Sequence, residues 1–217
     1  MKRFVLIGAG GFGREVASIM EYVNEFREFT YDLLGFVDDG DQFTEGMMIN
    51  GYPILGKTDW ILEHKDEDFY CNCTIGNPHT KAKIQRELMA QGVRFGNVYA
   101  FDAFVNPHTK VGKGCVFYGN AIVSVNCTIG DGVLCNQGVD IGHDAVIGDY
   151  TTIMPYSGIS GYCKIGSEVN IGGHAFIVPG KKVGDNATIA AGSIVFSNVK
   201  AGTTVLGNPA KRMRELE

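Results

Sequence analysis

A histidine followed directly by an aspartate is the pair in this sequence best suited to acid–base chemistry. His143 and Asp144 stand in the stretch Ile-Gly-His-Asp at residues 141–144. Imidazole titrates near neutral pH, so it can take a proton from an attacking amine or hydroxyl. A neighbouring carboxylate can orient the ring and stabilise the imidazolium. An exposed histidine is by default only a solvated side chain, so the pair alone leaves both interpretations open.

A glycine-rich segment near the N-terminus has the spacing of a phosphate-binding loop. Residues 4–7 predict a short buried strand, residues 8–13 read Gly-Ala-Gly-Gly-Phe-Gly, and residues 14–20 have the pattern of a helix. This order satisfies G-x-G-x-x-G between a strand and a helix, with Gly8, Gly10, Gly11 and Gly13 as the glycines concerned. Backbone N–H groups at such a helix N-terminus favour anions. A cradle for the phosphates of a nucleotide sugar is the main interpretation, and a dinucleotide site or a purely structural turn are the alternatives.

Short strands and helices alternate through the rest of the first hundred residues. Strands are predicted at 33–37, 52–56 and 69–75, and helices at 58–64 and 80–91. This βαβ order predicts a small parallel sheet covered by helices. Asp38 and Asp39 follow the second strand, where a Rossmann-like half-domain places an acid on a ribose or base. Gly76 and Asn77 follow the last of these strands.

A repeat of six residues organises the second half of the chain. From Val105 to Val195 an apolar residue recurs at every sixth position, and a small or short residue follows four positions later, with Lys181 as the exception. A period of six fits neither a helix nor a long strand, so it predicts short strands and corners in the three-sided coils of a parallel β-helix. Each coil then has eighteen residues, which stacks His143 on Gly161. Lys181 predicts a bulge or outward loop at its corner.

The cysteines are explained by the same packing. Four of them fall on inward or corner positions of the repeat, and Cys71 and Cys73 lie on a predicted strand with both thiols on one face. The C-x-x-C pairs typical of zinc sites are absent from the sequence. We therefore predict buried structural thiols and no metal, as is usual in a reducing compartment.

Composition argues against several classes of function. The 217 residues include 24 acidic and 19 basic side chains, for a net charge of -5. Basic residues form no run longer than a pair such as Lys211-Arg212 near the C-terminus, so nucleic acid is not an expected partner. No apolar run approaches the roughly 20 residues of a membrane span, and the N-terminus lacks the pattern of a signal peptide. The sequence predicts a cytoplasmic protein with no membrane insertion and with domains at residues 1–98 and 99–217.

The two halves together resemble one family. The glycine loop, the acidic pair at 38–39, the Ile-Gly-Asn stretch at 75–77, the hexads of residues 100–198 and the segment 205–213 are similar to bacterial acetyltransferases that modify nucleotide-linked 4-amino sugars. Sialic acid O-acetyltransferases are relatives of that family. The resemblance implies a left-handed parallel β-helix of hexapeptide repeats after a Rossmann-like α/β sheet. The sequence departs from the family at Phe12, where many members carry histidine.

The resemblance also implies roles for individual residues. Acetyl-CoA is the expected co-substrate, with His143 as the base, Asp144 as its partner and the Gly161 N–H on the thioester oxygen. Thr152 falls where some relatives have an acetyl-contacting histidine. The expected contacts to CoA phosphates are Lys181 and Lys211, and those to the nucleotide sugar are Gly8, Gly10, Gly11, Gly13, Asp38, Asp39, Gly76 and Asn77. A homotrimer with active sites between subunits is expected, and a C-terminal segment, helical from about Ala210, should cover the last coil.

Three functions follow from these observations. The first is an N-acetyltransferase for the 4-amino group of a nucleotide-linked deoxy-amino sugar in bacterial surface glycan biosynthesis, because the glycine loop and the acidic pair indicate a nucleotide on the acceptor. An O-acetyltransferase acting on sialic acid or another sugar hydroxyl would use the same His–Asp pair. A non-catalytic β-helix binding module would have no affinity for CoA and would not depend on His143.

Overall fold

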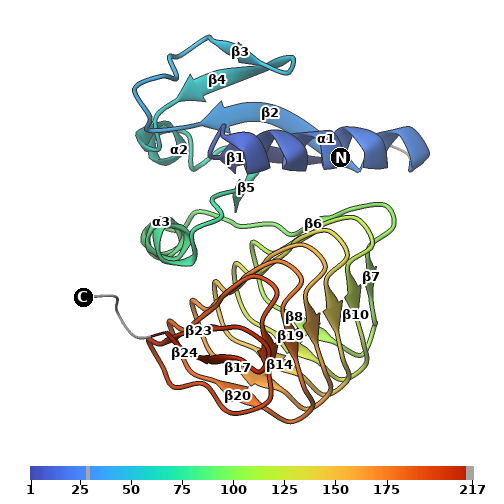
Figure 1. The fold of residues 1–217 in the computed structure, drawn as a ribbon. Coiled ribbons are helices and arrows are strands. Elements are labelled where there is room, and N and C mark those ends of the chain that lie inside the picture. Colours follow the sequence, from blue (N-terminus) through green and yellow to red (C-terminus); the bar gives the residue numbers. More distant parts are fainter. Residues whose placement is uncertain (28–29, 214–217) are drawn as a thin grey trace.

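The N-terminal part of the chain is a small α/β unit. The computed structural model describes residues 1–27 and 30–213 (Figure 1). The elements of this unit are β1 (Lys2–Ile7), α1 (Gly11–Phe26), β2 (Tyr31–Val37), β3 (Met48–Ile49), β4 (Tyr52–Gly56), α2 (Asp59–Glu63), β5 (Tyr70–Cys73) and α3 (Pro78–Ala90). The predicted strands and helices are confirmed, while α1 extends further than predicted and β3 was missed.

The sheet of this unit has the order β3-β4-β2-β1-β5, and its strands are parallel except for β3, which forms a hairpin with β4. Alternate residues of β1 face opposite sides. Phe4 and Leu6 pack in the cluster that contains the apolar side of α1, while Val5 and Ile7 pack in the cluster formed with α2 and α3. Burial on both faces explains the continuous apolar run that predicted this strand.

The C-terminal part is a parallel β-helix with three flat faces (Figure 1). Face 1 consists of β6 (Val98–Tyr99), β9 (Val116–Phe117), β12 (Leu134–Cys135), β15 (Thr152–Ile153), β18 (Asn170–Ile171), β21 (Thr188–Ile189), β23 (Thr204–Leu206) and β24 (Lys211–Arg212). Face 2 consists of β7 (Phe104–Val105), β10 (Ile122–Val123), β13 (Asp140–Ile141), β16 (Gly158–Ile159), β19 (Phe176–Ile177) and β22 (Ile194–Val195). Face 3 consists of β8 (Lys110–Val111), β11 (Thr128–Ile129), β14 (Val146–Ile147), β17 (Lys164–Ile165) and β20 (Lys182–Val183).

The hexad pattern sets the register of these coils. Residues pair with those eighteen positions later, as Ile141 does with Ile159, and the recurring apolar residues form one buried core. The short residues of the hexads lie at the corners and use their polar atoms there. The Ser157 hydroxyl donates to the Gly172 carbonyl at 2.8 Å, and the Cys127 thiol lies 3.2 Å from the Gly142 carbonyl oxygen. At these corners the short polar side chain therefore satisfies a backbone carbonyl oxygen.

Each corner places two separate demands on the backbone, close stacking on the next coil and a residue with positive φ. The glycine after the inward residue permits close stacking: a Cβ added at Gly142 would lie 2.5 Å from the Gly161 nitrogen of the next coil. Positive φ falls two residues later, and Asp144, Tyr162 and His174 adopt it there without being glycine. Close backbone approach, rather than positive φ, therefore explains the glycines directly after the inward residues. At the positive-φ position itself the repeat uses glycine in some coils, as at Gly132 and Gly180, and other residues elsewhere.

Two local expectations were wrong. Lys164 pairs with Lys182 in unbroken register, so there is no bulge at Lys181. The expected helix from Ala210 is absent from the described residues, because the chain turns back and Lys211–Arg212 forms β24, antiparallel to β23. The Ala210 N–H donates to the Ile194 carbonyl, so this segment covers the last coil by sheet pairing. Residues 214–217 of the expected helix lie outside the described part of the chain.

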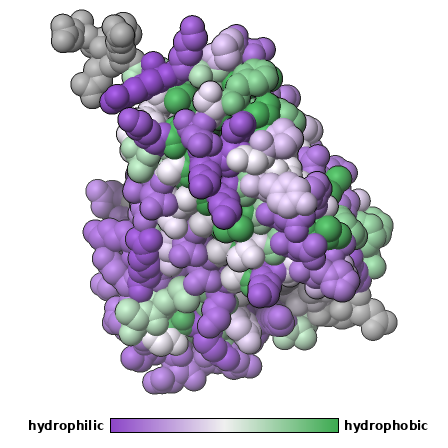
Figure 2. Space-filling model, turned by 90° about the horizontal axis from the view of Figure 1, so that it is seen from below, coloured by the Kyte–Doolittle hydropathy of each residue, from purple (hydrophilic) through white to green (hydrophobic). Residues whose placement is uncertain are grey.

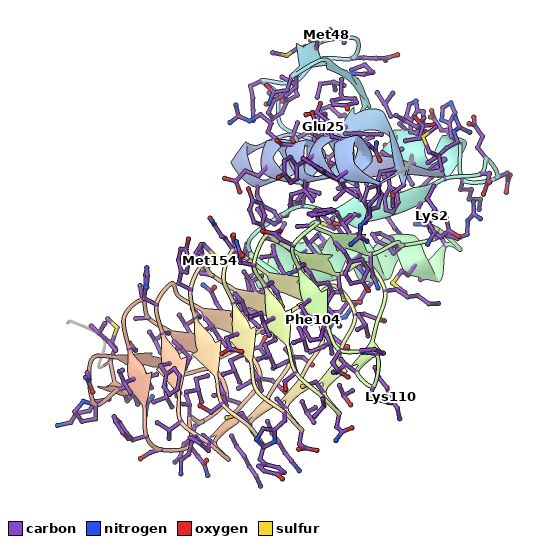
Figure 3. The ribbon with its side chains drawn as sticks, turned by 90° about the vertical axis from the view of Figure 1, so that its right-hand side faces the viewer. Lys2, Glu25, Met48, Phe104, Lys110 and Met154 are labelled. Carbon is purple, nitrogen blue, oxygen red and sulfur yellow. The ribbon has the colours of Figure 1, made fainter. Side chains whose placement is uncertain are left out.

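The outer surfaces of the faces differ in character. Outward residues of face 3 are mainly polar, and seen from below, hydrophilic side chains predominate while hydrophobic ones form separate patches (Figure 2). Face 2 instead exposes Phe104, Ile122 and Phe176 at 53%, 46% and 42% of their surfaces. Figure 3 looks toward this face, with Phe104 on it. Within the described residues, no helix is long and apolar enough to cross a membrane.

Candidate active site

The His143–Asp144 pair lies on the corner between faces 2 and 3. His143 Nδ1 is 2.9 Å from Asp144 Oδ2, and the side chains are 51% and 34% exposed. Asn126, one coil earlier, donates to the other carboxylate oxygen of Asp144 at 3.4 Å. Because the carboxylate faces Nδ1, the proton of the neutral ring belongs on Nδ1, and the lone pair on Nε2 is free to accept a proton.

Gly161 lies directly beside this imidazole. A Cβ added at Gly161 would lie 2.7 Å from His143 Nε2, so any side chain there would displace the ring. The Tyr162 ring meets the imidazole edge-on, with 5.0 Å between the ring centroids. The absence of a side chain at 161 therefore lets Nε2 lie across the Gly161 backbone.

The Gly161 amide lacks an acceptor in residues 1–27 and 30–213. Equivalent amides on the corner between faces 3 and 1 donate to an aspartate one coil later: Lys113 to Asp131 at 2.7 Å and Ser167 to Asp185 at 2.8 Å. The residue eighteen positions after Gly161 is Pro179, which offers no side-chain acceptor. The amide is thus free to bind an oxygen that gains negative charge beside His143.

A cleft of about 400 Å³ lies between the N-terminal unit and the corner of faces 1 and 2. One wall contains Gly11, Phe12 and Glu15 of α1 together with Gly76. The other wall comes from the β-helix and contains Tyr118, Leu134, Asn136, Gln137, Met154 and Pro155. Figure 3 shows Met154 at the edge of the β-helix nearest the N-terminal unit.

Two glycines of the loop are required by the fold, and two others lie in open space at the start of α1. Gly8 has φ +104°, and a Cβ at Gly13 would overlap the Gly8 carbonyl, so these two glycines let α1 follow β1 closely. Gly10 caps α1 without a side-chain acceptor, and nothing lies within 4 Å of a Cβ added at Gly10 or Gly11. The first N–H groups of α1 therefore remain available for an anion at the cleft.

The acidic pair and Asn77 are engaged within the N-terminal unit. Asp38 accepts from the backbone N–H groups of Ala9 and Gly40, each at 2.8 Å, and so ties the glycine loop to the end of β2. Asp39 accepts from both the N–H and the hydroxyl of Thr58. The Asn77 side chain caps α3. Gly76 was expected to contact the nucleotide sugar together with these three residues. Among the four, only Gly76 lines the cleft.

The three residues expected around acetyl-CoA lie in different places. Thr152 is 1% exposed beneath α3 on face 1, and the structure does not bring it to His143. Lys181 lies on the corner of His143, two coils further on, and is half-buried. Lys211 is exposed in β24 at the C-terminal edge of face 1. The residues that the structure does bring together are His143, Asp144 and Gly161.

Reasoning from the sequence missed several residues around these sites. Asn126 and Tyr162 stand eighteen positions before and after Asp144, so the coil period already contained the signal for both. Glu15, Tyr118 and Gln137 of the cleft depend on how the two units dock, and no spacing in the sequence indicates that docking.

The buried thiols are poorly suited to nucleophilic chemistry. All six cysteines are free and buried. Burial raises the pKa of Cys73 to about 11 and the pKa of Cys115 to about 12, and it also raises the pKa of Cys135. A thiol that stays protonated is a weak nucleophile. The described residues contain no group of three or more His, Cys, Asp or Glu side chains placed to hold a metal ion.

A β-helix with an exposed His–Asp pair beside a free backbone amide defines the class as a hexapeptide-repeat acyltransferase. Residues 144–179 match the family described as bacterial transferase hexapeptide (six repeats), and residues 3–88 match the PglD N-terminal domain. A GDP-perosamine N-acetyltransferase from Escherichia coli O157:H7 is 31% identical over 99% of this chain and 97% of its own length. The chain belongs to the family of bacterial hexapeptide-repeat sugar acetyltransferases.

Solved structures show the same architecture. The acetyltransferase domain of PglB from Neisseria gonorrhoeae FA1090, in complex with acetyl coenzyme A, is 30% identical with a TM-score of 0.89, covering 98% of this chain and 99% of that one. PerB from Caulobacter crescentus, in complex with CoA and GDP-perosamine, is 21% identical with a TM-score of 0.88 over 99% and 98% of the chains. The predicted fold, a Rossmann-like sheet followed by a left-handed parallel β-helix, is confirmed.

Proposed function

We propose that the protein transfers the acetyl group of acetyl-CoA to the 4-amino group of a nucleotide-linked deoxy-amino sugar used for bacterial surface glycans. The observation that carries this proposal is the arrangement of His143, Asp144 and Gly161: an Nε2 lone pair and a free N–H on one exposed corner. The E. coli relative, named for N-acetylation of GDP-perosamine, supports a nucleotide-linked amine as acceptor. The PglB domain with bound acetyl coenzyme A supports the donor.

The reaction needs one proton acceptor and one anion site. His143 Nε2 takes a proton from the amine as its nitrogen attacks the thioester carbonyl carbon. The Gly161 N–H donates to the carbonyl oxygen as it becomes negative. Asp144 keeps the ring oriented and stabilises the imidazolium. When the C–S bond breaks, the imidazolium returns its proton to the CoA thiolate, so amide and free thiol leave with the histidine neutral.

The cleft beside α1 is the proposed acceptor site. Phosphates of the nucleotide would meet the free N–H groups at the start of α1, where the helix dipole also favours negative charge. Glu15, Asn136 and Gln137 supply hydrogen-bonding groups for a sugar, and Phe12, Leu134 and Met154 supply apolar surface. Asp38 contributes by holding the loop in place through Ala9. Lys181, on the His143 corner, remains our candidate for CoA, and Lys211 is the second.

A homotrimer completes the proposed active site. The acceptor cleft lies on one long edge of face 2 and His143 lies on the other, so one chain holds them apart. If the exposed apolar residues of face 2 turn toward a common axis, each copy's His143 edge meets the cleft edge of the next copy. Such a heterologous contact closes into a ring when three prisms pack together. We place this assembly in the cytoplasm, which its six free thiols support.

Release of free thiol from acetyl-CoA tests the proposal. The purified full chain is assayed with GDP- and UDP-linked 4-amino sugars and, in a separate arm, with free sialic acid. We expect activity with a nucleotide-linked amine and a loss of about 10²–10⁴-fold in kcat/KM for His143→Ala. His108→Ala is the matched control, because His108 is exposed on the same corner two coils earlier.

Two results would overturn the assignment. Near-wild-type kcat/KM in His143→Ala would remove the imidazole from the chemistry. Turnover of sialic acid without turnover of any nucleotide-linked amine would establish O-acetyl transfer instead. Mass measurement at concentrations used in the assay separately tests the trimer, and a fully active monomer would contradict a site shared between copies.

A further inference from the structure

A buried lysine lies directly behind the cleft. Lys81 of α3 is 1% exposed, and its Nζ donates to the Thr152 hydroxyl at 3.0 Å. The Thr152 hydroxyl donates in turn to the Gly76 carbonyl at 3.0 Å. The chain of hydrogen bonds therefore runs from α3, through the first residue of β15, to the loop that forms one edge of the cleft.

Thr152 also connects to the opposite wall of the cleft. It pairs in register with Leu134, and Met154 and Pro155 follow it two and three residues later. Leu134, Met154 and Pro155 all line the cleft, while Gly76 lines it from the N-terminal unit. One hydroxyl thus links the two units at the point where they face the same ligand space.

Stability alone does not account for an ammonium at this position. Burial lowers the pKa of Lys81 to about 8, and the ionisable groups that face it are the thiols of Cys73, Cys115 and Cys135, which offer no negative charge at neutral pH. An apolar side chain of similar length would fill this space without the cost of desolvating a charge. The hydrogen bond to Thr152 is the specific interaction that a lysine adds.

We propose that Lys81 and Thr152 are positioning residues that fix the Gly76 edge of the cleft at one distance from the β-helix wall. The inference rests on the proposed function for the nature of the ligand. Lys81 holds the Thr152 oxygen, so that the hydroxyl proton points to Gly76. With Gly76 fixed, the cleft is preformed for the acceptor and loses less conformational freedom on binding.

The remaining contacts of α3 provide an internal comparison. Glu168 accepts from Arg86 at 2.7 Å and from His79 at 2.8 Å, and Gln85 donates to the Lys113 carbonyl at 3.1 Å. Glu168 and Lys113 lie on the corner of faces 3 and 1, and neither lines the cleft. These contacts attach α3 to the β-helix without reaching Gly76.

Steady-state kinetics with matched variants test the role. Thr152→Val removes the hydroxyl at constant shape, and Thr152→Ser retains it. We expect Thr152→Val and Lys81→Met to raise the acceptor KM about tenfold, which corresponds to about 1.4 kcal/mol, the size of one hydrogen bond. The KM for acetyl-CoA and kcat should change less than about twofold, and Thr152→Ser should stay near wild type. Glu168→Gln, which loosens α3 elsewhere, should leave the acceptor KM near wild type.

Three kinetic outcomes would overturn the inference. The first is a Thr152→Val enzyme with wild-type acceptor KM, the second is an equal rise in both KM values, and the third is a Glu168→Gln enzyme that matches Thr152→Val. Hydrogen exchange of residues 74–80 in the ligand-free protein gives an answer that does not depend on activity. Exchange should be faster in Thr152→Val and unchanged in Thr152→Ser, and equal rates in all three proteins would refute the role. If the wild type acetylates no nucleotide sugar, the proposed function fails while the exchange result still decides this inference.

Discussion

Replacing Lys81 by methionine is predicted to make the protein more stable at neutral pH and less stable at high pH. The ordinary lysine pKa of 10.5 falls to about 8 in the folded protein because the group is buried. At about 1.4 kcal/mol per pH unit, this lowering means that folding at pH 7 costs about 3 kcal/mol for the ammonium. Lys81→Met removes that cost and loses one hydrogen bond worth about 1 kcal/mol. The expected net gain at pH 7 is about 2 kcal/mol in the free energy of unfolding.

The sign of the pH dependence follows from proton counting. Between about pH 8 and 10.5 the unfolded chain holds a proton on Lys81 that the folded chain has released, so the stability of the wild type rises with pH across that window. The methionine variant lacks this rise. The stability difference between the variant and the wild type should therefore shrink by about 2 kcal/mol from pH 7 to pH 9.5. Above that pH the lost hydrogen bond should leave the variant slightly less stable.

Urea unfolding of both proteins at half-unit steps from pH 6.5 to 9.5 measures this difference. The thiols of Cys73, Cys115 and Cys135 face Lys81 in both proteins, and because burial raises their pKa values, they remain protonated in the folded state over this range. Their deprotonation in the unfolded chain cancels when the two curves are subtracted. A variant that is less stable than the wild type at pH 7, or a difference that does not change with pH, would refute the reasoning.

Three further predictions concern other residues. Asp144→Asn keeps a residue that tolerates positive φ but removes the negative charge at His143 Nδ1. The value of kcat should therefore fall by about 10²-fold or more, while the melting temperature stays near that of the wild type. An unchanged kcat would contradict the role of the carboxylate. Gly161→Ala places a methyl group 2.7 Å from His143 Nε2, so kcat should fall at least about tenfold with little change in acceptor KM, and a fully active variant would contradict the close stacking. Glu168→Gln removes a carboxylate whose pKa is raised by burial but lowered more strongly by His79 and Arg86, with a net lowering. The variant should therefore lose about 1 kcal/mol of stability at pH values above the ordinary pKa of 4.5, and this deficit should shrink as the pH falls through the lowered pKa of Glu168. A deficit that does not change with pH on the acid side of 4.5 would contradict the ion pair.

The β-helix was predictable because its geometry is repeated in the sequence. An inward residue such as Ile141 must be apolar in every coil, and the residue four positions later must fit a corner, as Ala145 does. The position of Gly161 beside His143 followed from adding eighteen, because parallel coils pair in constant register. The proximity of these two residues therefore came from arithmetic on the repeat. The identity of the atoms that meet, Nε2 beside an unpartnered amide, required the structure.

The docking of the N-terminal unit was not predictable from the same sequence. Lys81 and Thr152 are 71 positions apart and belong to elements with unrelated patterns. In the helical pattern of residues 80–91, a lysine is expected to face solvent. The sequence likewise placed Asp38 on a nucleotide by analogy, while the structure shows both its oxygens accepting backbone N–H groups. The same polar residue types form hydrogen bonds within the fold and bind ligands. Only the three-dimensional arrangement shows which of the two roles a given residue has.

The three corners of the β-helix share one backbone path and differ in what stands one coil later. On the corner of faces 3 and 1, aspartates one coil later accept hydrogen bonds from the backbone N–H groups of Lys113 and Ser167. These two N–H groups are therefore satisfied within the protein. On the corner of faces 2 and 3, Pro179 leaves the Gly161 amide without such an acceptor, and the imidazole of His143 lies beside it. The inward residues form the buried apolar core of every coil, so the fold does not require an aspartate at each corner. A single change of residue type in an outward column is therefore enough to turn a structural amide into one that can stabilise negative charge.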